Sequence, residues 1–203
     1  MCIKKTLDMY RKFVKRVIDF TLSLLGLILL FVPMLVIAIA IKIDSKGPVI
    51  FKQKRLGKNE KIFTVMKFRT MCNHAYENGG IVTSSGDVRI TRVGAFLRRS
   101  SLDELPQMIN IIKGEMSIIG PRPILSCEFD DFRTNSYYCK RHSVLPGMFC
   151  SVDVNYRASA DRDLQFKMDA EYAESLSFSL DFKLFFKILK TVLTGKHVYV
   201  EEK

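Results

Sequence analysis

The stretch FTLSLLGLILLFVPMLVIAIAI, residues 20–41, decides the architecture because it holds 22 residues without a single charge. About 20 apolar residues suffice for a helix to cross the hydrocarbon core of a bilayer. Pro33 lies near the middle, where its ring removes one backbone hydrogen bond and pushes against the preceding turn. We therefore expect a membrane segment of two helical halves with a sharp bend at Pro33.

Basic residues flank this segment on both sides. Residues 1–61 hold 13 Lys/Arg against 4 Asp/Glu, whereas residues 62–203 hold 19 against 17. Because Lys and Arg accumulate on the cytoplasmic side of membrane segments, two basic flanks favour a hairpin that enters and leaves by that face. A kinked helix that still spans the bilayer remains the alternative. A signal peptide does not fit, because the apolar region of a signal peptide is shorter than the stretch 20–41 and ends in a cleavage site.

The charge also narrows the class of partner. A basic cluster beside a membrane segment attracts anionic lipid headgroups. A nucleic-acid site would instead place the charge along a folded groove with interleaved aromatic residues, so we expect membrane lipids and no nucleic acid. Five cysteines without a C-x-x-C pair and three histidines without ligand spacing indicate a reduced, cytosolic setting.

Two short β segments are predicted next, GPVIFKQKRLG at 47–57 and KIFTVMKFRTM at 61–71. Alternate residues of a strand share a side, so KFR points Lys67 and Arg69 the same way. Phosphate binding and two solvated charges at a sheet edge fit this pair equally well.

The run VGAFLRRSSLDELPQMINIIKGEMSIIGPRP, residues 93–123, carries the most information. Apolar residues at helical spacing, followed by a basic last turn and Gly114, predict a helix that begins at Asp103 and Glu104. Ser101 and Glu104 match a capping box, which would make the acids purely structural. Pro106 weakens that interpretation, and Arg98 lies close enough in sequence to bring an anionic substrate to the same place.

The GPRP motif, residues 120–123, is the second candidate for substrate binding. Pro121 and Pro123 restrict the chain on either side of Arg122, and a rigidly presented guanidinium suits a phosphate group. A proline-rich turn with a solvent-exposed arginine is the simpler alternative.

These fragments occur in a fixed order after a proline-broken hydrophobic segment: GPVIFKQKRLG, KFRTM, RITRVGAFLRRSSLDELPQMINIIKGEMSIIGPRP and RHSVLPGM. With them, the chain resembles the small bacterial polyprenyl-phosphate phosphoglycosyl transferases, the monotopic sugar transferases, from about Phe13 to about Thr194. The resemblance implies an enzyme that moves a phosphosugar from a UDP-sugar to undecaprenyl phosphate, using Mg²⁺ and releasing UMP. It implies a first membrane step of polysaccharide or glycoconjugate synthesis, at the cytoplasmic face of the bacterial inner membrane, and leaves a homodimer open.

The same resemblance assigns roles to particular residues. Asp103 becomes the nucleophile that forms a covalent aspartyl intermediate, Glu104 the residue associated with the metal, and Pro33 the break in a re-entrant helix. Candidates for phosphate contacts are Lys67, Arg98, Arg122 and Arg157. The family's segment I-T-G-W-A-Q-V-N-G-R reads MFCSVDVNYR here, residues 148–157, so Cys150, Asp153 and Tyr156 replace a glycine, a glutamine and a glycine.

The tail SLSFSLDFKLFFKILKTVL, residues 175–193, predicts an amphipathic helix with lysines on one stripe and phenylalanines on another, suited to a membrane surface or to the core.

Taken together, these patterns and the resemblance predict a mostly helical α+β monotopic protein. Residues 1–45 would form the re-entrant hairpin and residues 46–203 a cytosolic catalytic domain. A catalytically silent membrane adaptor that recruits later glycosyltransferases is the alternative function, because of the altered segment 150–156.

Overall fold

Helices dominate this computed structural model, which describes residues 9–73, 75, 87–154, 156 and 161–194. Two small sheets accompany them. β1 (Ile50–Leu56) pairs antiparallel with β2 (Ile62–Phe68), and β3 (Ser117–Ile119) pairs parallel with β4 (Gly147–Phe149). The predicted mostly helical α+β class and the two predicted β segments are therefore confirmed.

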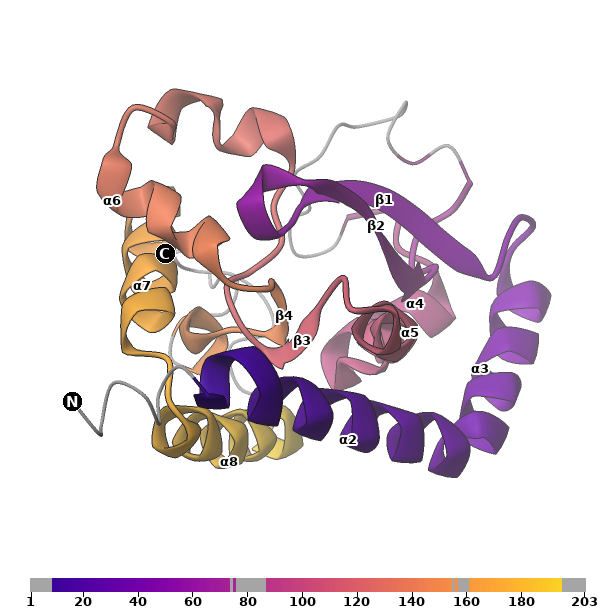
Figure 1. Cartoon of the computed structure of the whole chain (residues 1–203). Helices are drawn as coiled ribbons and strands as arrows, with labels where there is room; N and C mark the ends of the chain where they lie inside the picture. The colour runs from indigo at the N-terminus through magenta and orange to yellow at the C-terminus, as the bar shows by residue number, and fades with distance from the viewer. Residues whose placement is uncertain (1–8, 74, 76–86, 155, 157–160, 195–203) are drawn as a thin grey trace.

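The apolar segment folds as a bent helix pair (Figure 1). It comprises η1 (Tyr10–Val14), α2 (Lys15–Leu29) and α3 (Phe31–Asp44), with a bend of 63°. The break lies at Leu30, not at Pro33 as expected. A proline ring excludes the carbonyl of the residue four positions earlier, here Leu29, so α2 ends there and Pro33 falls in the first turn of α3. No single described helix is long and apolar enough to cross a bilayer, but this pair passes that test together.

The first half of the pair is fastened to the rest of the protein by polar side chains. Asp19 is buried and accepts hydrogen bonds from Ser117 Oγ at 2.7 Å and the Ile118 N–H at 3.2 Å. Lys15 pairs with the buried Asp181 at 2.7 Å. Arg16 donates to the last carbonyls of α5 (Gln107–Lys113). Charges that the sequence assigned to the membrane flank therefore also hold α2 against the protein.

The β1–β2 hairpin carries α5 on one side. Val65 of β2 packs against Ile111 and Met116. The buried Asn110 side chain accepts from the Met66 N–H at 3.1 Å and donates to the Thr64 carbonyl at 2.7 Å. Its polar contacts therefore set the position of α5 relative to the strand.

Helix α4 (Arg92–Ser100) rests on the chain that follows β2. Thr91 caps it by accepting from the Gly94 N–H at 3.0 Å. A Cβ atom at Gly94 would lie 2.0 Å from the Thr70 carbonyl oxygen, so only glycine permits this approach. The contact brings the end of α4 close to the residues that follow Phe68.

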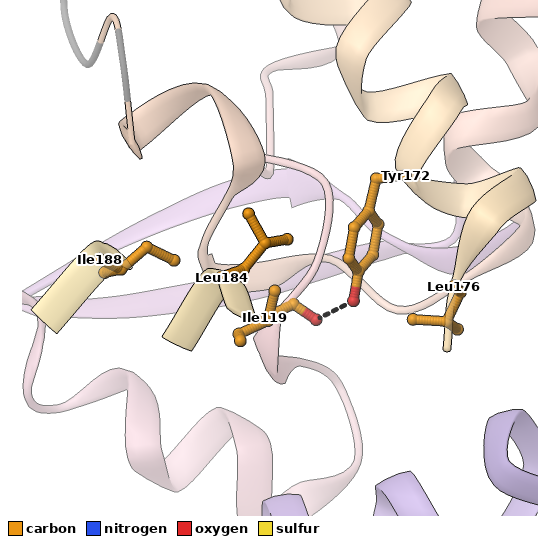
Figure 2. Packing of buried hydrophobic residues seen from close by; sticks show 5 residues of the cluster. All are labelled: Ile119, Tyr172, Leu176, Leu184 and Ile188. Carbon is orange, nitrogen blue, oxygen red and sulfur yellow. Dashed lines mark hydrogen bonds between the residues drawn. The ribbon is translucent and has the colours of Figure 1, made fainter. Parts of the chain in front are cut away.

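The C-terminal part consists of short helical turns followed by two longer helices. These are η4 (Ser126–Glu128), η5 (Asp130–Phe132), α6 (Ser136–Cys139), η6 (Lys140–Ser143), η7 (Ser151–Val154), α7 (Arg162–Ser175) and α8 (Phe178–Thr194). Figure 2 shows how α7 and α8 close a cluster over β3, formed by Ile119, Tyr172, Leu176, Leu184 and Ile188. The predicted tail helix is confirmed as α8, and it leaves Phe178, Phe182, Phe185 and Phe186 exposed.

Candidate active site

Asp103 and Glu104 lie in a tight turn between two helices, not at the start of one. α4 ends at Ser100, the next residue, Ser101, has a left-handed φ of 57°, and the acids occupy the one-turn 3₁₀ helix η3 (Leu102–Glu104). Ser101 makes no side-chain capping bond there, so the predicted capping box is not formed. α5 begins only at Gln107, although Leu105 and Pro106 already have helical backbone angles. With three residues per 3₁₀ turn, the two carboxylates diverge by about 120°.

Lys67 reaches this turn from the neighbouring strand. Its Nζ lies 2.8 Å from Glu104 Oε1, and both side chains are partly exposed, at 29% and 20%. A half-buried ion pair of this kind orients the carboxylate without removing it from solvent.

Arg98 approaches from the last turn of α4. Its Nε donates to Thr70 Oγ1 at 2.9 Å.

Burial raises the pKa of the Asp103 carboxyl to about 6. The negative charge of Glu104 raises this pKa further, whereas the positive charges of Lys67 and Arg98 lower it. A carboxylate with this pKa is ionised at neutral pH yet poorly solvated, which suits a nucleophile.

The GPRP turn follows β3 and faces the same region. Gly120 and Gly147 are in such close contact that a Cβ on Gly147 would lie 2.1 Å from the Gly120 nitrogen. The Arg122 guanidinium is 46% exposed, pairs with Asp153 at 3.2 Å and interacts electrostatically with Glu104. The charge of Glu104 therefore acts on the guanidinium that the GPRP turn carries.

Arg69 lies elsewhere, although it was grouped with Lys67. Its side chain is buried and donates to the carbonyls of Ser45 and Lys46 at 2.7 Å each, just beyond the end of α3. The structure therefore gives Arg69 the role of anchoring the end of the helix pair, and this geometry does not support a phosphate contact. β2 ends at Phe68, so the strand alternation that paired the two side chains does not extend to Arg69.

The divergent segment is described only in part, and Arg157 lies outside the described residues. Asp153 accepts from the Cys150 N–H at 2.9 Å with one oxygen and from Arg122 with the other. Tyr156 is 38% exposed, and Cys150 is buried. The carboxylate at 153 thus joins the divergent segment to the GPRP turn, a contact that the sequence did not reveal.

Sequence reasoning also missed a buried pair behind the GPRP turn, Arg141 and Asp169. Two sequence features were available: Arg141 opens the RHSVLPGM fragment, and Asp169 lies one helical turn after Gln165 in α7. Neither signal identified the partner.

The donor set fits a metal ion bound together with substrate. Mg²⁺ in enzymes is commonly held by one or two carboxylates and by substrate phosphates. Glu104 offers one partly exposed carboxylate beside Asp103. Within the described part of the chain, no three His, Cys, Asp or Glu side chains gather into a complete protein-made site.

Several known proteins are similar to this chain over most of its length. The sequence model of the family described as bacterial sugar transferase matches residues 10–195. The chain is 39% identical over 187 residues to the UDP-N-acetylgalactosamine-undecaprenyl-phosphate N-acetylgalactosaminephosphotransferase of Aeromonas hydrophila, covering 90% of this chain and 44% of that protein. It is 38% identical over 191 residues to the UDP-glucose:undecaprenyl-phosphate glucose-1-phosphate transferase of Klebsiella pneumoniae, covering 91% and 41%.

A shorter relative matches almost from end to end. The exopolysaccharide production protein PSS of Rhizobium leguminosarum bv. phaseoli is 37% identical over 194 residues, covering 89% of this chain and 95% of that protein. The chain thus spans less than half the length of the first two relatives and nearly all of the third.

Proposed function

The chain belongs to the bacterial sugar transferase family, and from this membership we propose that it transfers a phosphosugar from a UDP-sugar to undecaprenyl phosphate. UMP is the second product. The observation that carries the proposal is the meeting of Asp103 and Glu104 with Lys67, Arg98 and Arg122 inside the matched residues. Such a step serves polysaccharide or glycoconjugate synthesis.

The reaction proceeds by two displacements at one phosphorus atom. The Asp103 carboxylate attacks the β-phosphorus of the UDP-sugar, the bond to the bridging oxygen breaks, and UMP leaves with that oxygen. A phosphate oxygen of the lipid acceptor then attacks the same phosphorus and releases the Asp103 carboxylate. Covalent catalysis of this kind lets the soluble nucleotide leave before the lipid acceptor reacts.

The cations around Asp103 divide the remaining work. Lys67 orients Glu104 and favours the ionised form of Asp103, while Arg98 adds positive charge beside it. Arg122 presents an exposed guanidinium that suits bidentate contact with a phosphate. Glu104 would hold Mg²⁺, which neutralises pyrophosphate charge when it is bound.

The helix pair provides the membrane attachment in this proposal. The 63° bend, the exposed apolar side chains of α2 and α3 and the basic residues after α3 support a hairpin that stays in the cytoplasmic leaflet. The exposed phenylalanines of α8 lie near the start of the bent helix pair. The rings of Tyr10 and Phe178 meet edge to face there, with their centroids 5.9 Å apart. The catalytic part then faces the cytoplasm at the inner membrane.

The reaction is tested on the full chain in membrane vesicles. A panel of UDP-sugars with undecaprenyl phosphate should give UMP release from at least one donor. Incubation with labelled UDP-sugar and no lipid should leave about one phosphosugar per active chain on the peptide that contains Asp103, as double displacement requires. UMP release that needs the lipid, with no labelled peptide, would argue for direct transfer. No release from any donor would favour the adaptor function.

The topology is tested by impermeant thiol labelling in intact cells. Cys2 and Cys72 should both be protected, because both would face the cytoplasm. Labelling of Cys2 alone would restore a single span. Pro33→Leu should move part of the population toward the spanning form, because the missing backbone bond returns.

A further inference from the structure

A buried ion pair lies directly behind the GPRP turn. Arg141 is only 2% exposed and packs against two aromatic rings, with its guanidinium 5.9 Å from the Phe129 centroid and 4.9 Å from that of Phe166. Its Nη2 donates to Asp169 Oδ2 at 2.7 Å, and Asp169 is fully buried. We call Arg141 and Asp169 the clamp.

The clamp contacts the backbone of Arg122 on both sides of the residue. Arg141 Nη2 donates to the Arg122 carbonyl oxygen at 2.5 Å. Asp169 Oδ1 accepts from the Arg122 N–H at 3.4 Å, a long bond. Both backbone polar groups of Arg122 therefore depend on one ion pair, while its side chain extends away toward Asp153.

The clamp lies beside a buried aromatic cluster that includes Phe129 and Phe166. Replacing a buried ion pair with well-packed apolar residues is often neutral or stabilising, so stability alone is a weak explanation for such a pair. Its contacts with Arg122 point to a positional role.

We propose that Arg141 and Asp169 are positioning residues that hold the Arg122 backbone so that its guanidinium is presented to the pyrophosphate of the nucleotide donor. This inference rests on the proposed function, because it assumes that Arg122 contacts a phosphate. The clamp itself touches no substrate and acts only through Arg122.

The test compares UDP with uridine as probes, by calorimetry on the full chain in detergent. Arg141→Met/Asp169→Leu removes both charges together and leaves no unpaired one. UDP should bind about tenfold more weakly, the loss of one oriented charge-assisted contact, while uridine, which has no phosphate, should bind as before. Equal weakening of both probes would mean general disruption and would overturn the proposal.

A second comparison asks whether the clamp acts through Arg122. In an Arg122→Ala background, the clamp substitutions should cause no further loss of UDP affinity. Additive losses would overturn the proposal. If Arg122→Ala binds UDP like the wild type, both the clamp and the role of Arg122 fail. The proposed reaction still stands in that case if labelled Asp103 is recovered.

Two further variants separate position from stability. Lys15→Met/Asp181→Asn alters another partly buried ion pair and should lower the melting temperature without changing UDP affinity. If the double clamp variant does not fold, Arg141→Lys serves in its place. It keeps the charge but loses the planar fork, so it should weaken UDP and spare uridine. Unchanged UDP affinity in a folded Arg141→Lys chain would overturn the proposal.

Discussion

The two turns that form the candidate site are held in different ways. The turn of residues 101–104 is partly buried and oriented by side-chain contacts from another element, chiefly the 2.8 Å Lys67–Glu104 pair. The turn of residues 120–123 has its backbone held by two prolines and the clamp, yet its Arg122 side chain is 46% exposed. Neighbouring charges therefore shift the pKa of Asp103, the group proposed to react. Arg122, the group proposed to bind phosphate, extends instead from a backbone that is held in place. Substitutions at the first turn should change chemistry and pH dependence, and those at the second should change affinity.

The largest effect is expected from Asp103→Asn. The amide keeps the shape of the side chain but cannot attack phosphorus, so UMP release should fall by at least about 10³-fold, including in the first turnover. Rapid-quench measurement of UMP checks this. Asp131→Asn, an exposed carboxylate in η5, is the matched control and should leave the rate unchanged. A normal first-turnover burst in Asp103→Asn would reduce Asp103 to a metal ligand.

Lys67→Met should act through both carboxylates. Lys67 lowers the pKa of Asp103, so its loss should move the acid limb of the pH–rate profile upward from about 6. The rate at pH 7 should fall about 100-fold and should recover in part at higher pH, because more Asp103 becomes ionised. Lys61→Met, on an exposed lysine just before β2, should leave the profile unchanged. An unshifted acid limb would contradict the assigned effect on Asp103.

Glu104→Gln should reduce the rate less than Asp103→Asn, by about tenfold, and raise the magnesium concentration needed for half-maximal rate. The amide removes a negative ligand and also the partner of Lys67. Titration of Mg²⁺ at saturating donor measures the change. If the variant showed the same magnesium dependence as the wild type, Glu104 would not bind the metal and would serve only to pair with Lys67.

Asp153→Gln probes the second turn and should have a small effect. The Asp153 carboxylate pairs with Arg122 in an exposed position, where ion pairs contribute about 0–1 kcal/mol, so its removal should tighten UDP binding by about two- to fivefold. The amide oxygen can still accept from the Cys150 N–H. The double variant Asp153→Gln/Tyr156→Gly should alter the order in which UDP-sugars rank by transfer rate. An unchanged ranking and affinity would make both positions structural.

The smallest expected change is a pH-dependent one in stability. The folded-state pKa of Asp103 is raised, so the wild type loses stability as pH rises from about 4 through about 6, where the buried group ionises. Asp103→Asn avoids this loss, and its melting temperature should exceed that of the wild type by a few degrees at pH 8 and match it near pH 4. Scanning calorimetry at both pH values checks the sign. A variant less stable than the wild type at pH 8 would contradict the assigned burial.

Patterns among near neighbours determined much of this protein. The charge-free stretch 20–41, the strand pair, the acids beside Arg98, the GPRP turn and the amphipathic tail were all predicted from periodicity, proline chemistry and residue type. Each lies within one short stretch of the chain, so local sequence is sufficient to indicate it.

Only the tertiary structure decided which partner each charged group takes. Arg16 and Arg69 donate to carbonyls at or beyond the ends of α5 and α3. Ser101 adopts a left-handed conformation that the capping pattern did not foresee. Arg141 meets Asp169 across 28 positions. The physical reason is that a charged side chain bonds to whichever group the packing brings within reach, and that packing depends on contacts far apart in the sequence.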